Sequence, residues 1–318
     1  MGSGLRAPGS GAPRVAFLGT PEVAVPALRA LAAGADVAAV FCNPDRPAGR
    51  GRVLTPPPVK AAALELGLPV HQPERWKLPE TRALWESLHI DLAVVVAYGH
   101  ILPAWMLDSL RLGAWNLHFS LLPKWRGASP VNFAILEGDA ETGVSLMGLA
   151  QGLDEGPVLA QVRRPITLAD DAESLLAALS GEAAGLLAAH LPALLGGTAR
   201  PEPQTGPHTY APKLAKEMAR LDCAEPALIL HRRVRALQPW PAAELPLQGQ
   251  VLKVLGVGAL RPSGDAPGTL RWDRAGAWLT AGDGQALELT RLQRPGKPVQ
   301  PALQALQPWG PSGHALVG

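Results

Sequence analysis

The sequence predicts an α/β protein in which a mainly parallel sheet is followed by a smaller β-barrel. Three observations support this fold class. A strand–helix–strand rhythm opens the chain at 14–42. An apolar run at 92–98 has the composition of a central parallel strand that is covered on both faces. Short apolar runs between turns fill the region after residue 250, as in a small barrel.

Composition suggests where the two domains meet. The chain has 318 residues, of which 47% are hydrophobic, so it is long enough for two domains with sizeable cores. Residues 198–212 are rich in proline, glycine and polar side chains, as in a linker. We therefore expect a short disordered tail at 1–13, a first domain at 14–197, a linker at 198–216 and a second domain at 217–318.

The first strand–helix–strand unit carries clear local signals. Residues 14–18 form an apolar run that ends in the turn Gly-Thr-Pro-Glu at 19–22. Thr20 suits the N-cap of a helix, the following proline suits the first helical position, and the glutamate favours the positive helix end. A helix to about Ala33 and a strand at 37–42 would complete a right-handed parallel unit.

The remaining elements follow from apolar periodicity and from glycine and proline punctuation. Helices are expected at 59–66, 81–88, 103–110, 131–137, 172–195 and 227–237. Strands are expected at 68–71, 92–98, 114–118, 143–147, 158–163, 251–255, 268–272, 277–280 and 286–292.

Residues 43–58 are too long and too rich in proline and glycine for an ordinary strand–helix connection. Arg46, Arg50, Arg52 and Lys60 make this segment basic. Composition leaves two interpretations open, a solvated surface loop or an arm that holds an anion or a phosphate backbone. The C-terminal part of the chain is also mildly basic, which fits a nucleic-acid surface without requiring one.

Polar side chains gather where predicted strands end, which is where α/β proteins place their chemistry. Asn116 and His118 lie two positions apart on one predicted strand, so their side chains point the same way. Asp154 follows a different strand, in a glycine-flanked turn. An amide beside an imidazole suits a developing oxyanion, and an imidazole moves protons near neutral pH. Each residue alone is more often structural, but together they predict acyl transfer to an amine without a covalent intermediate.

Ser120 offers a second interpretation, as a nucleophile. Its Ser-Leu-Leu-Pro context is more typical of a loop whose backbone holds a ligand. The common nucleotide, esterase and zincin signatures GxGxxG, GxxxxGK[ST], GxSxG and HExxH are absent from the sequence.

Cysteine usage and hydropathy indicate in which cellular compartment the protein is expected. Cys42 and Cys223 are far apart and form no CxxC, which argues against a disulfide scaffold or a cysteine zinc site. No metal is expected. The N-terminal residues lack the apolar core of a secretory signal, and no run of about 18 apolar residues occurs. We expect a cytoplasmic monomer without a membrane span.

Several motifs resemble those of a known family and occur in the same order along the chain. NLHFSLLPKWRGASP resembles the signature N-x-H-x-S-L-L-P-x-x-x-G of the folate-dependent formyltransferases, and GDAETGVSLM with GLDEGPVLAQ looks like its downstream part. The resemblance extends over the chain and narrows to the branch that acts on methionyl-tRNA. The further segments that are similar to this branch are RVAFLGTPEVAVPAL, NPDRPAGRGRVLTPPPVK, VVVAYGHILP, TYAPKLAKEMARLD, RALQPWP and the AGDGQALEL…PGK run.

The resemblance implies a Rossmann-like first domain and an OB-like, tRNA-binding second domain. The formyl group of 10-formyltetrahydrofolate would pass to the α-amino group of methionine on initiator tRNA, for translation initiation. By family analogy the catalytic residues would be Asn116, His118 and Asp154. The residues that would line the tetrahydrofolate site are Ser120, Leu121, Leu122 and Pro123. The residues that would approach the methionyl group or the tRNA are Phe17, Arg46, Arg50 and Arg52.

Two positions depart from the family pattern. Phe119 fills a slot where small residues are usual, which affects the shape of the folate pocket. Glu155 stands where threonine is common and adds a charge beside Asp154. We expect neither to abolish activity.

Four other functions compete with formyl transfer to methionyl-tRNA. The nearest is formyl transfer to a sugar-nucleotide amine or to glycinamide ribonucleotide, which the basic arm and the second domain disfavour. Hydrolysis by the same trio would replace the amine with water. A non-catalytic RNA-binding protein would not need the amide, imidazole and carboxylate together. A nicotinamide dehydrogenase is disfavoured by the missing glycine fingerprint.

Overall fold

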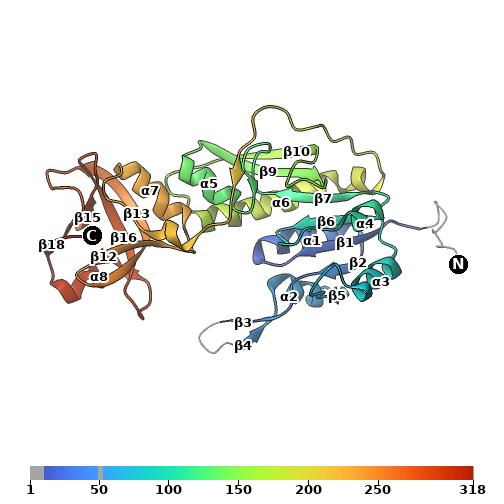
Figure 1. The fold of residues 1–318 in the computed structure, drawn as a ribbon, viewed down its shortest axis with the longest axis horizontal. Coiled ribbons are helices and arrows are strands. Elements are labelled where there is room, and N and C mark those ends of the chain that lie inside the picture. Colours follow the sequence, from blue (N-terminus) through green and yellow to red (C-terminus); the bar gives the residue numbers. More distant parts are fainter. Residues whose placement is uncertain (1–10, 49–52, 318) are drawn as a thin grey trace. The chain divides into compact units, whose positions relative to one another are not determined.

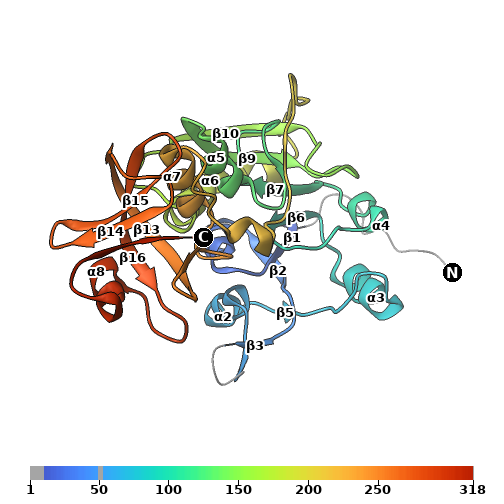
Figure 2. The same cartoon turned by 60° about the vertical axis from the view of Figure 1, so that its left-hand side comes forward.

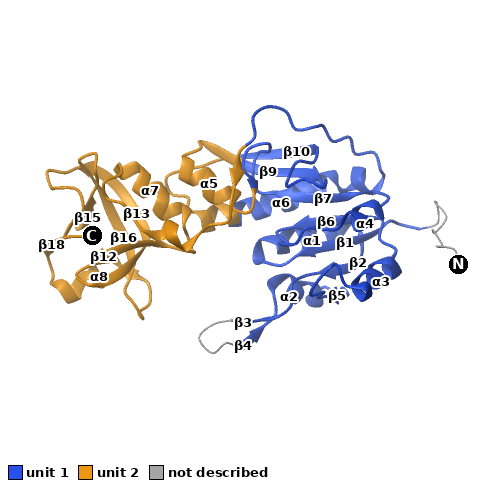
Figure 3. Ribbon diagram, in the orientation of Figure 1, with its two compact units in different colours: residues 1–126, 143–163, 177–208 blue, residues 127–142, 164–176, 209–318 orange. Residues whose placement is uncertain are grey.

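The computed structural model describes residues 11–48 and 53–317. The chain divides into two compact units (Figure 3). Unit 1 comprises residues 1–126, 143–163 and 177–208, and unit 2 comprises residues 127–142, 164–176 and 209–318. The arm residues Arg50 and Arg52, and most of the tail predicted at 1–13, lie outside the described residues.

A seven-stranded, mainly parallel sheet organises unit 1 (Figure 1). The strand order is β10-β9-β7-β6-β1-β2-β5. Neighbours from β7 to β5 pair in parallel, whereas β9 runs antiparallel to β7. The mainly parallel sheet predicted from the sequence is thus confirmed. Its strands are β1 (Arg14–Gly19), β2 (Asp36–Phe41), β5 (Val70–His71), β6 (Leu92–Val96), β7 (Ala114–His118), β9 (Glu141–Gly148) and β10 (Val158–Pro165).

Helices connect these strands and cover the sheet. They are η1 (Glu22–Ala24), α1 (Val25–Gly34), α2 (Pro58–Glu65), α3 (Pro79–Leu88), α4 (Ala104–Asp108) and α6 (Ala172–Leu195). On one face, Leu18 of β1 and Val95 of β6 share a buried cluster with Trp85 of α3 and Met106 of α4. Each such side chain contributes roughly 1.5–3 kcal/mol by leaving water. This packing fixes the strand ends that carry the site.

The predicted N-cap at Thr20 is wrong. The first turn is a 3₁₀ helix with Pro21 at its N-cap and no side-chain cap. The Thr20 hydroxyl instead accepts a hydrogen bond from the amide of Asn43 at 3.2 Å. Asn43 follows β2, so Thr20 joins the carboxyl ends of β1 and β2. A side-chain contact across the sheet edge has displaced the local cap.

The segment predicted as a long basic loop contains a β-hairpin, β3 (Arg46–Ala48) and β4 (Val53–Thr55). Val53 and Leu54 are 68% and 64% exposed. At the base of the hairpin the Lys60 ammonium lies 2.8 Å from the Asp45 carboxylate. Hydrogen bonds from Lys60 and then from Gln72 hold the pKa of the Asp45 carboxyl below its usual value. The hairpin is therefore anchored at its base while its strands face solvent.

Helix α6 is the one helix in the described part of the chain that is long and apolar enough to cross a membrane. In this structure one face of α6 packs against η1 and α1, and 33% of its most apolar stretch is buried. Leu187 and Leu191 are buried, the Leu191 side chain lies against Gly34 of α1, and the Ser180 hydroxyl donates to the carbonyl of Val23. Its apolar side chains serve the folded core, as in many long core helices.

Unit 2 is built on an antiparallel sheet with the order β12-β13-β16-β15-β14-β18, and β17 pairs with β16 (Figure 2). The sheet curls, which is consistent with the OB-like barrel that the resemblance implies. Its strands are β12 (Ala243–Leu247), β13 (Gln250–Pro262), β14 (Thr269–Asp273), β15 (Gly276–Thr280), β16 (Gln285–Gln293), β17 (Gln300–Pro301) and β18 (Gly313–Leu316). The other elements are α5 (Pro130–Glu137), β11 (Tyr210–Ala211), η2 (Lys216–Ala219), α7 (Ala227–Ala236), α8 (Ala302–Leu306) and η3 (Gln307–Trp309). The strand β8 (Arg126–Gly127) lies at the boundary in the chain, with Arg126 in unit 1 and Gly127 in unit 2.

The β13 strand is much longer than the five residues predicted at 251–255. Gly256 and Gly258, which follow the predicted run, lie inside the strand. The register with β16 shifts at Val254/Gly256, Gly256/Val257 and Val257/Leu260. Such bulges bend a strand and increase its twist, which lets one long strand serve a curled sheet.

Candidate active site

Asn116 and His118 lie at the carboxyl end of β7, between β6 and β9. Asn116 is opposite Val95 on the parallel side and Met147 on the antiparallel side. His118 is opposite Ser145 of β9. Being two residues apart on one strand, both side chains project from the same face, as the sequence predicted. Asn116 is half-buried and His118 is 5% exposed.

The two nitrogens of His118 have different surroundings. Nε2 lies 2.8 Å from the carbonyl oxygen of Trp125. Since a carbonyl only accepts, Nε2 must carry the hydrogen. Nδ1 lies 3.7 Å from Oδ2 of Asp154. The ring is thus held in place through Nε2, and Nδ1 is the nitrogen that faces the carboxylate and is left for chemistry.

Asp154 reaches His118 from the loop between β9 and β10. Its side chain is 13% exposed, and its backbone has a φ of 51°, in the left-handed region. Aspartate tolerates this conformation better than most residues. The Gln204 side-chain amide donates to the carbonyls of Asp154 at 2.7 Å and Gly156 at 2.8 Å. The structure therefore brings His118 and Asp154 together, as predicted.

The loop predicted to hold folate, Ser120–Pro123, follows β7 directly. Ser145 bridges it: the amide of Leu122 donates to the Ser145 hydroxyl at 3.1 Å, and that hydroxyl donates to the carbonyl of Ser120 at 2.6 Å. Gln161 donates to the carbonyl of Leu122 at 2.9 Å and to Ser145 at 2.8 Å. The loop is held rigidly by β9 and β10.

Much of the loop backbone is therefore already paired. The amide of Ser120 donates to the carbonyl of His118, and the carbonyl of Leu121 accepts from the amide of Lys124. The sequence suggested a loop whose backbone holds a ligand. The pairing instead leaves the loop to contribute mainly shape, through the half-buried side chains of Leu121 and Pro123.

Other predicted contact residues lie elsewhere in unit 1. Phe17 is 0% exposed, and its ring covers Gly19, where an added Cβ would come within 2.8 Å of the ring. Contact of this ring with a substrate would require the ring or its cover to move. Arg46 is exposed on β3. Arg50 and Arg52 are outside the described residues.

Sequence reasoning missed the residues that hold the site together. Ser145 is fully buried on β9, Gln161 lies on β10, and Gln204 lies in the segment predicted as a linker. Their contacts reach across 25, 39 and 50 residues of sequence. No local periodicity signals such contacts, although the motifs GDAETGVSLM and GLDEGPVLAQ contain Ser145 and Gln161.

The two departures from the family pattern are accommodated. Phe119 is buried, at 7% exposed. The Glu155 carboxylate turns back over Gly152, where an added Cβ would clash with it. It lies 3.5 Å from Nη1 of Arg126. The second carboxylate beside Asp154 therefore has a cation of its own.

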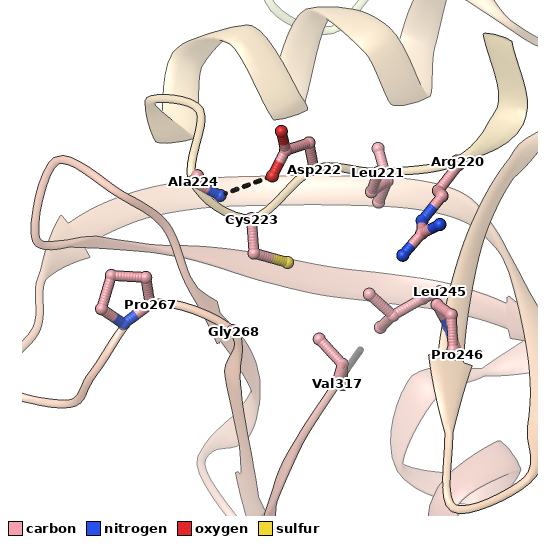
Figure 4. Close-up of a pocket in the computed structure, with 10 residues that line it drawn as sticks. All are labelled: Arg220, Leu221, Asp222, Cys223, Ala224, Leu245, Pro246, Pro267, Gly268 and Val317. Atoms are coloured by element: carbon pink, nitrogen blue, oxygen red, sulfur yellow. Dashed lines mark hydrogen bonds between the residues drawn. The ribbon is translucent and has the colours of Figure 1, made fainter.

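A cavity of about 570 Å³ lies in unit 2 (Figure 4). Arg220, Asp222, Cys223 and Pro246 are among its lining residues. Burial and the neighbouring Asp222 raise the pKa of the Cys223 thiol to about 11, which leaves it a poor nucleophile at neutral pH. The chemistry is therefore assigned to the strand ends of unit 1 and not to this cavity. In the described part of the chain, no group of three His, Cys, Asp or Glu side chains could hold a metal.

Comparison with known proteins identifies the family to which the chain belongs. The sequence profile "Formyl transferase" matches residues 13–190, and the profile "Formyl transferase, C-terminal domain" matches residues 213–308. Among solved structures, an N-formyltransferase from Helicobacter canadensis, in complex with folinic acid and dTDP-3-aminofucose, has a TM-score of 0.66 at 17% identity, covering 89% of this chain and 99% of its own. At that identity the likeness concerns the fold.

Curated relatives are much more similar. The methionyl-tRNA formyltransferase of Halorhodospira halophila is 48% identical over 299 residues, which cover 93% of this chain and 96% of the relative. The one from Methylococcus capsulatus is 46% identical over 313 residues, covering 96% and 98%. With matched profiles over both units and relatives of this similarity, the chain belongs to the formyltransferase family, in its methionyl-tRNA formyltransferase branch.

Proposed function

We propose that this protein transfers the formyl group of 10-formyltetrahydrofolate to the α-amino group of methionine on initiator tRNA. The observation that carries the proposal is the His118–Asp154 pair at the end of β7, in a chain 48% identical to a methionyl-tRNA formyltransferase over nearly its whole length. The product, N-formylmethionyl-tRNA, initiates translation.

The reaction is an acyl transfer between two amines. The methionyl nitrogen attacks the formyl carbon, a C–N bond forms, and the formyl oxygen takes the negative charge. The intermediate then breaks its bond to N10 of tetrahydrofolate, which gains a proton while the new amide loses one. Both substrates are supplied, so no enzyme nucleophile is needed, and Ser120 has its hydroxyl engaged with the carbonyl of Lys124 at 2.6 Å.

Asn116 and His118 stabilise the oxyanion. The Asn116 amide donates one hydrogen bond, and protonated His118 donates another from Nδ1, because Nε2–H is given to Trp125. One such donor is worth roughly 3–4 kcal/mol in the transition state. Asp154 supplies a negative charge beside Nδ1 and accepts, directly or through a water, the proton that the attacking amine releases.

Positioning supplies much of the remaining rate. Holding two reactants in an attack geometry is worth about 7–11 kcal/mol. We assign the folate site to the Ser120–Pro123 loop, whose rigid backbone presents Leu121 and Pro123. Several solved relatives of the same fold contain tetrahydrofolate or folinic acid. These complexes support a folate donor, and its place at the Ser120–Pro123 loop is part of the proposal.

We assign catalysis to residues 14–197, with 198–216 as a linker, and tRNA binding to 217–318 together with the arm around Arg46. Arg50 and Arg52 extend the basic character of the arm in the sequence. Phe17 is assigned to the neighbourhood of the methionyl group. We further propose that the protein acts as a cytoplasmic monomer without a membrane partner.

The closest competing function is formylation of an amino sugar, since solved structures of sugar N-formyltransferases share the fold. The test is to supply 10-formyltetrahydrofolate with methionyl initiator tRNA, methionyl elongator tRNA, a nucleotide-linked amino sugar, or no acceptor. We expect formylmethionine on initiator tRNA as the main product. Faster formylation of the amino sugar, or formate release without acceptor formylation, would overturn the proposal.

A further inference from the structure

The Asp154 carboxylate projects from a turn with an unusual backbone conformation. Asp154 has a left-handed φ of 51°, and its neighbour Leu153 is 57% exposed. Gly152 and Gly156 flank the turn and allow the chain wide freedom in isolation. The backbone of this turn therefore sets where the carboxylate lies relative to His118.

Gln204 contacts this turn from a distant part of the chain. Its Nε2 donates to two carbonyls of the turn, Asp154 at 2.7 Å and Gly156 at 2.8 Å. Its Oε1 accepts from Nε of Arg126 at 3.1 Å and from Nη2 at 2.8 Å. Two donors and two acceptor positions of one carboxamide are thus engaged, which fixes its orientation and leaves nothing for solvent.

Arg126 completes the arrangement. It is 9% exposed, and its third nitrogen, Nη1, lies 3.5 Å from the Glu155 carboxylate on the same turn. The preceding residue, Trp125, accepts the hydrogen bond from Nε2 of His118. The Trp125–Arg126 dipeptide therefore holds His118 through a backbone carbonyl and holds the Asp154 turn through Gln204.

These contacts form a closed circuit within unit 1. It runs from His118 to the carbonyl of Trp125, along the chain to Arg126, across to Gln204, on to the backbone of Asp154, and back to Nδ1 of His118. Movement of the His118 ring would break its hydrogen bond to Trp125, and movement of the Asp154 backbone would break its hydrogen bond to Gln204. A positional error of about 1 Å in such a site can cost on the order of 10²-fold in rate.

We propose that Gln204, held by Arg126, is a positioning residue for formyl transfer that acts through Asp154. Gln204 contacts the turn backbone and not the reacting atoms, so its effect on rate depends on the Asp154 carboxylate. Glu155 contributes to the same arrangement. Its carboxylate is paired with Arg126, which adds a second contact between Arg126 and the turn.

The proposal rests on the proposed function for its kinetic readout, and the test is a double-mutant cycle. Gln204→Leu, which keeps the size and removes the amide, is combined with Asp154→Ala, and kcat is measured with both substrates saturating. In the native background we expect kcat to fall roughly 10- to 100-fold, with both KM values within about threefold. In the Asp154→Ala background we expect Gln204→Leu to change the residual rate less than about twofold.

Gln151→Leu is the matched control. It makes the same chemical change on an exposed side chain of the loop that carries Asp154. We expect it to leave kcat near the native value. An equal loss from Gln204→Leu in both backgrounds, or an unchanged kcat, would contradict the proposal.

Backbone hydrogen exchange separates failure of this inference from failure of the proposed function, because it needs no turnover. We expect Gln204→Leu to speed exchange in residues 150–157, while Gln151→Leu does not and the rest of unit 1 keeps its protection. Unchanged exchange in 150–157 would overturn the positioning role. If the native protein formylates no acceptor, the proposed function fails, and the exchange result still decides the role of Gln204.

Discussion

The polar edge of the unit 1 sheet and the core of the unit 2 sheet are built on opposite principles. At the end of β7, the buried side chains of His118, Ser120 and Ser145 are polar, and each is bonded to a backbone carbonyl. In the unit 2 sheet the buried cluster consists largely of leucine, alanine and valine, with Leu270, Leu279 and Leu287 all 0% exposed.

The difference shows what each region must specify. Hydrogen bonds are directional, so the polar edge fixes where a few atoms lie. Apolar burial is non-directional, so the leucine core supplies stability and a curled shape. Changes at the edge should therefore cost rate more than stability, and changes in the core should cost stability more than rate.

The largest effect should come from the edge. We expect His118→Ala to lower kcat/KM for formyl transfer by at least about 10²–10³-fold, because it removes an oxyanion donor worth roughly 3–4 kcal/mol. Asp154→Ala should show a comparable loss. tRNA affinity should be unchanged in both, as should the free energy of unfolding to within about 1 kcal/mol. Single-turnover kinetics and tRNA titration measure the two properties separately.

His89→Asn is the matched histidine control. His89 is exposed at the left-handed C-cap of α3, where asparagine is well tolerated. Its activity should equal that of the native protein. Full single-turnover activity in His118→Ala or Asp154→Ala would contradict the claim that the polar edge determines the rate.

The core should show the opposite behaviour. Leu279 of β15 is 0% exposed and is paired with Leu270 and Leu287 on the neighbouring strands. Leu279→Ala should lower the free energy of unfolding by about 3 kcal/mol, through lost burial and the cavity it leaves. In the folded fraction, kcat should stay close to native. Denaturant unfolding and kcat at low temperature test this, and a large loss of kcat with unchanged stability would reverse the comparison.

Helix α7 places the titratable side chain of His231 among the buried and mainly apolar residues of unit 2. His231 is 4% exposed and accepts a hydrogen bond at Nδ1 from Nε of Arg235 at 3.0 Å. Burial, followed by the charge of Arg235, lowers the pKa of His231 from 6.5 to about 4. The folded state therefore holds His231 neutral, whereas the unfolded chain binds a proton below pH 6.5.

Stability should consequently be at its full value above pH 6.5 and fall as the pH drops towards 4. The contribution from His231 should amount to roughly 2 kcal/mol by about pH 5. Comparing the pH dependence of unfolding in the native protein and His231→Phe isolates this contribution by its slope. Identical slopes would show that His231 is not held neutral.

The smallest effect should come from the folate loop. Gln161→Leu removes the donor to the carbonyl of Leu122 and to Ser145. One hydrogen bond of this kind is worth about 1 kcal/mol, so the KM for 10-formyltetrahydrofolate should rise roughly fivefold, with kcat little changed. Steady-state kinetics in the folate donor test this. A fall in kcat at constant KM would place Gln161 in the chemistry and not in the loop.

Local patterns predicted much of the fold. Helix α6 occupies residues 172–195 and β7 occupies residues 114–118, as expected, because apolar periodicity and glycine ends are local signals. The β12 strand was missed since Pro246 interrupts its apolar run, although a proline is compatible with its place at one end of the sheet order. The α8 helix and the β18 strand were also missed.

The site was predicted in part. Two positions on one strand place Asn116 and His118 together, and the glycine-flanked turn after a different strand indicated Asp154. The contacts of Arg126 and Gln204, 78 residues apart, depend on how distant segments meet in three dimensions. Thr20 is a second example of a distant contact that the sequence did not predict. Its neighbours predicted a helix cap, but its hydroxyl accepts a hydrogen bond from the amide of Asn43 instead.

The most direct test of the account is a single turnover of the native protein with labelled 10-formyltetrahydrofolate and methionyl initiator tRNA. Enzyme is in excess, and formylmethionine, tetrahydrofolate and formate are measured together over time. We expect formylmethionine and tetrahydrofolate to appear at the same rate and in equal amounts, without free formate. Formate appearing in place of formylmethionine would show that the His118–Asp154 site delivers the formyl group to water, and would contradict the account.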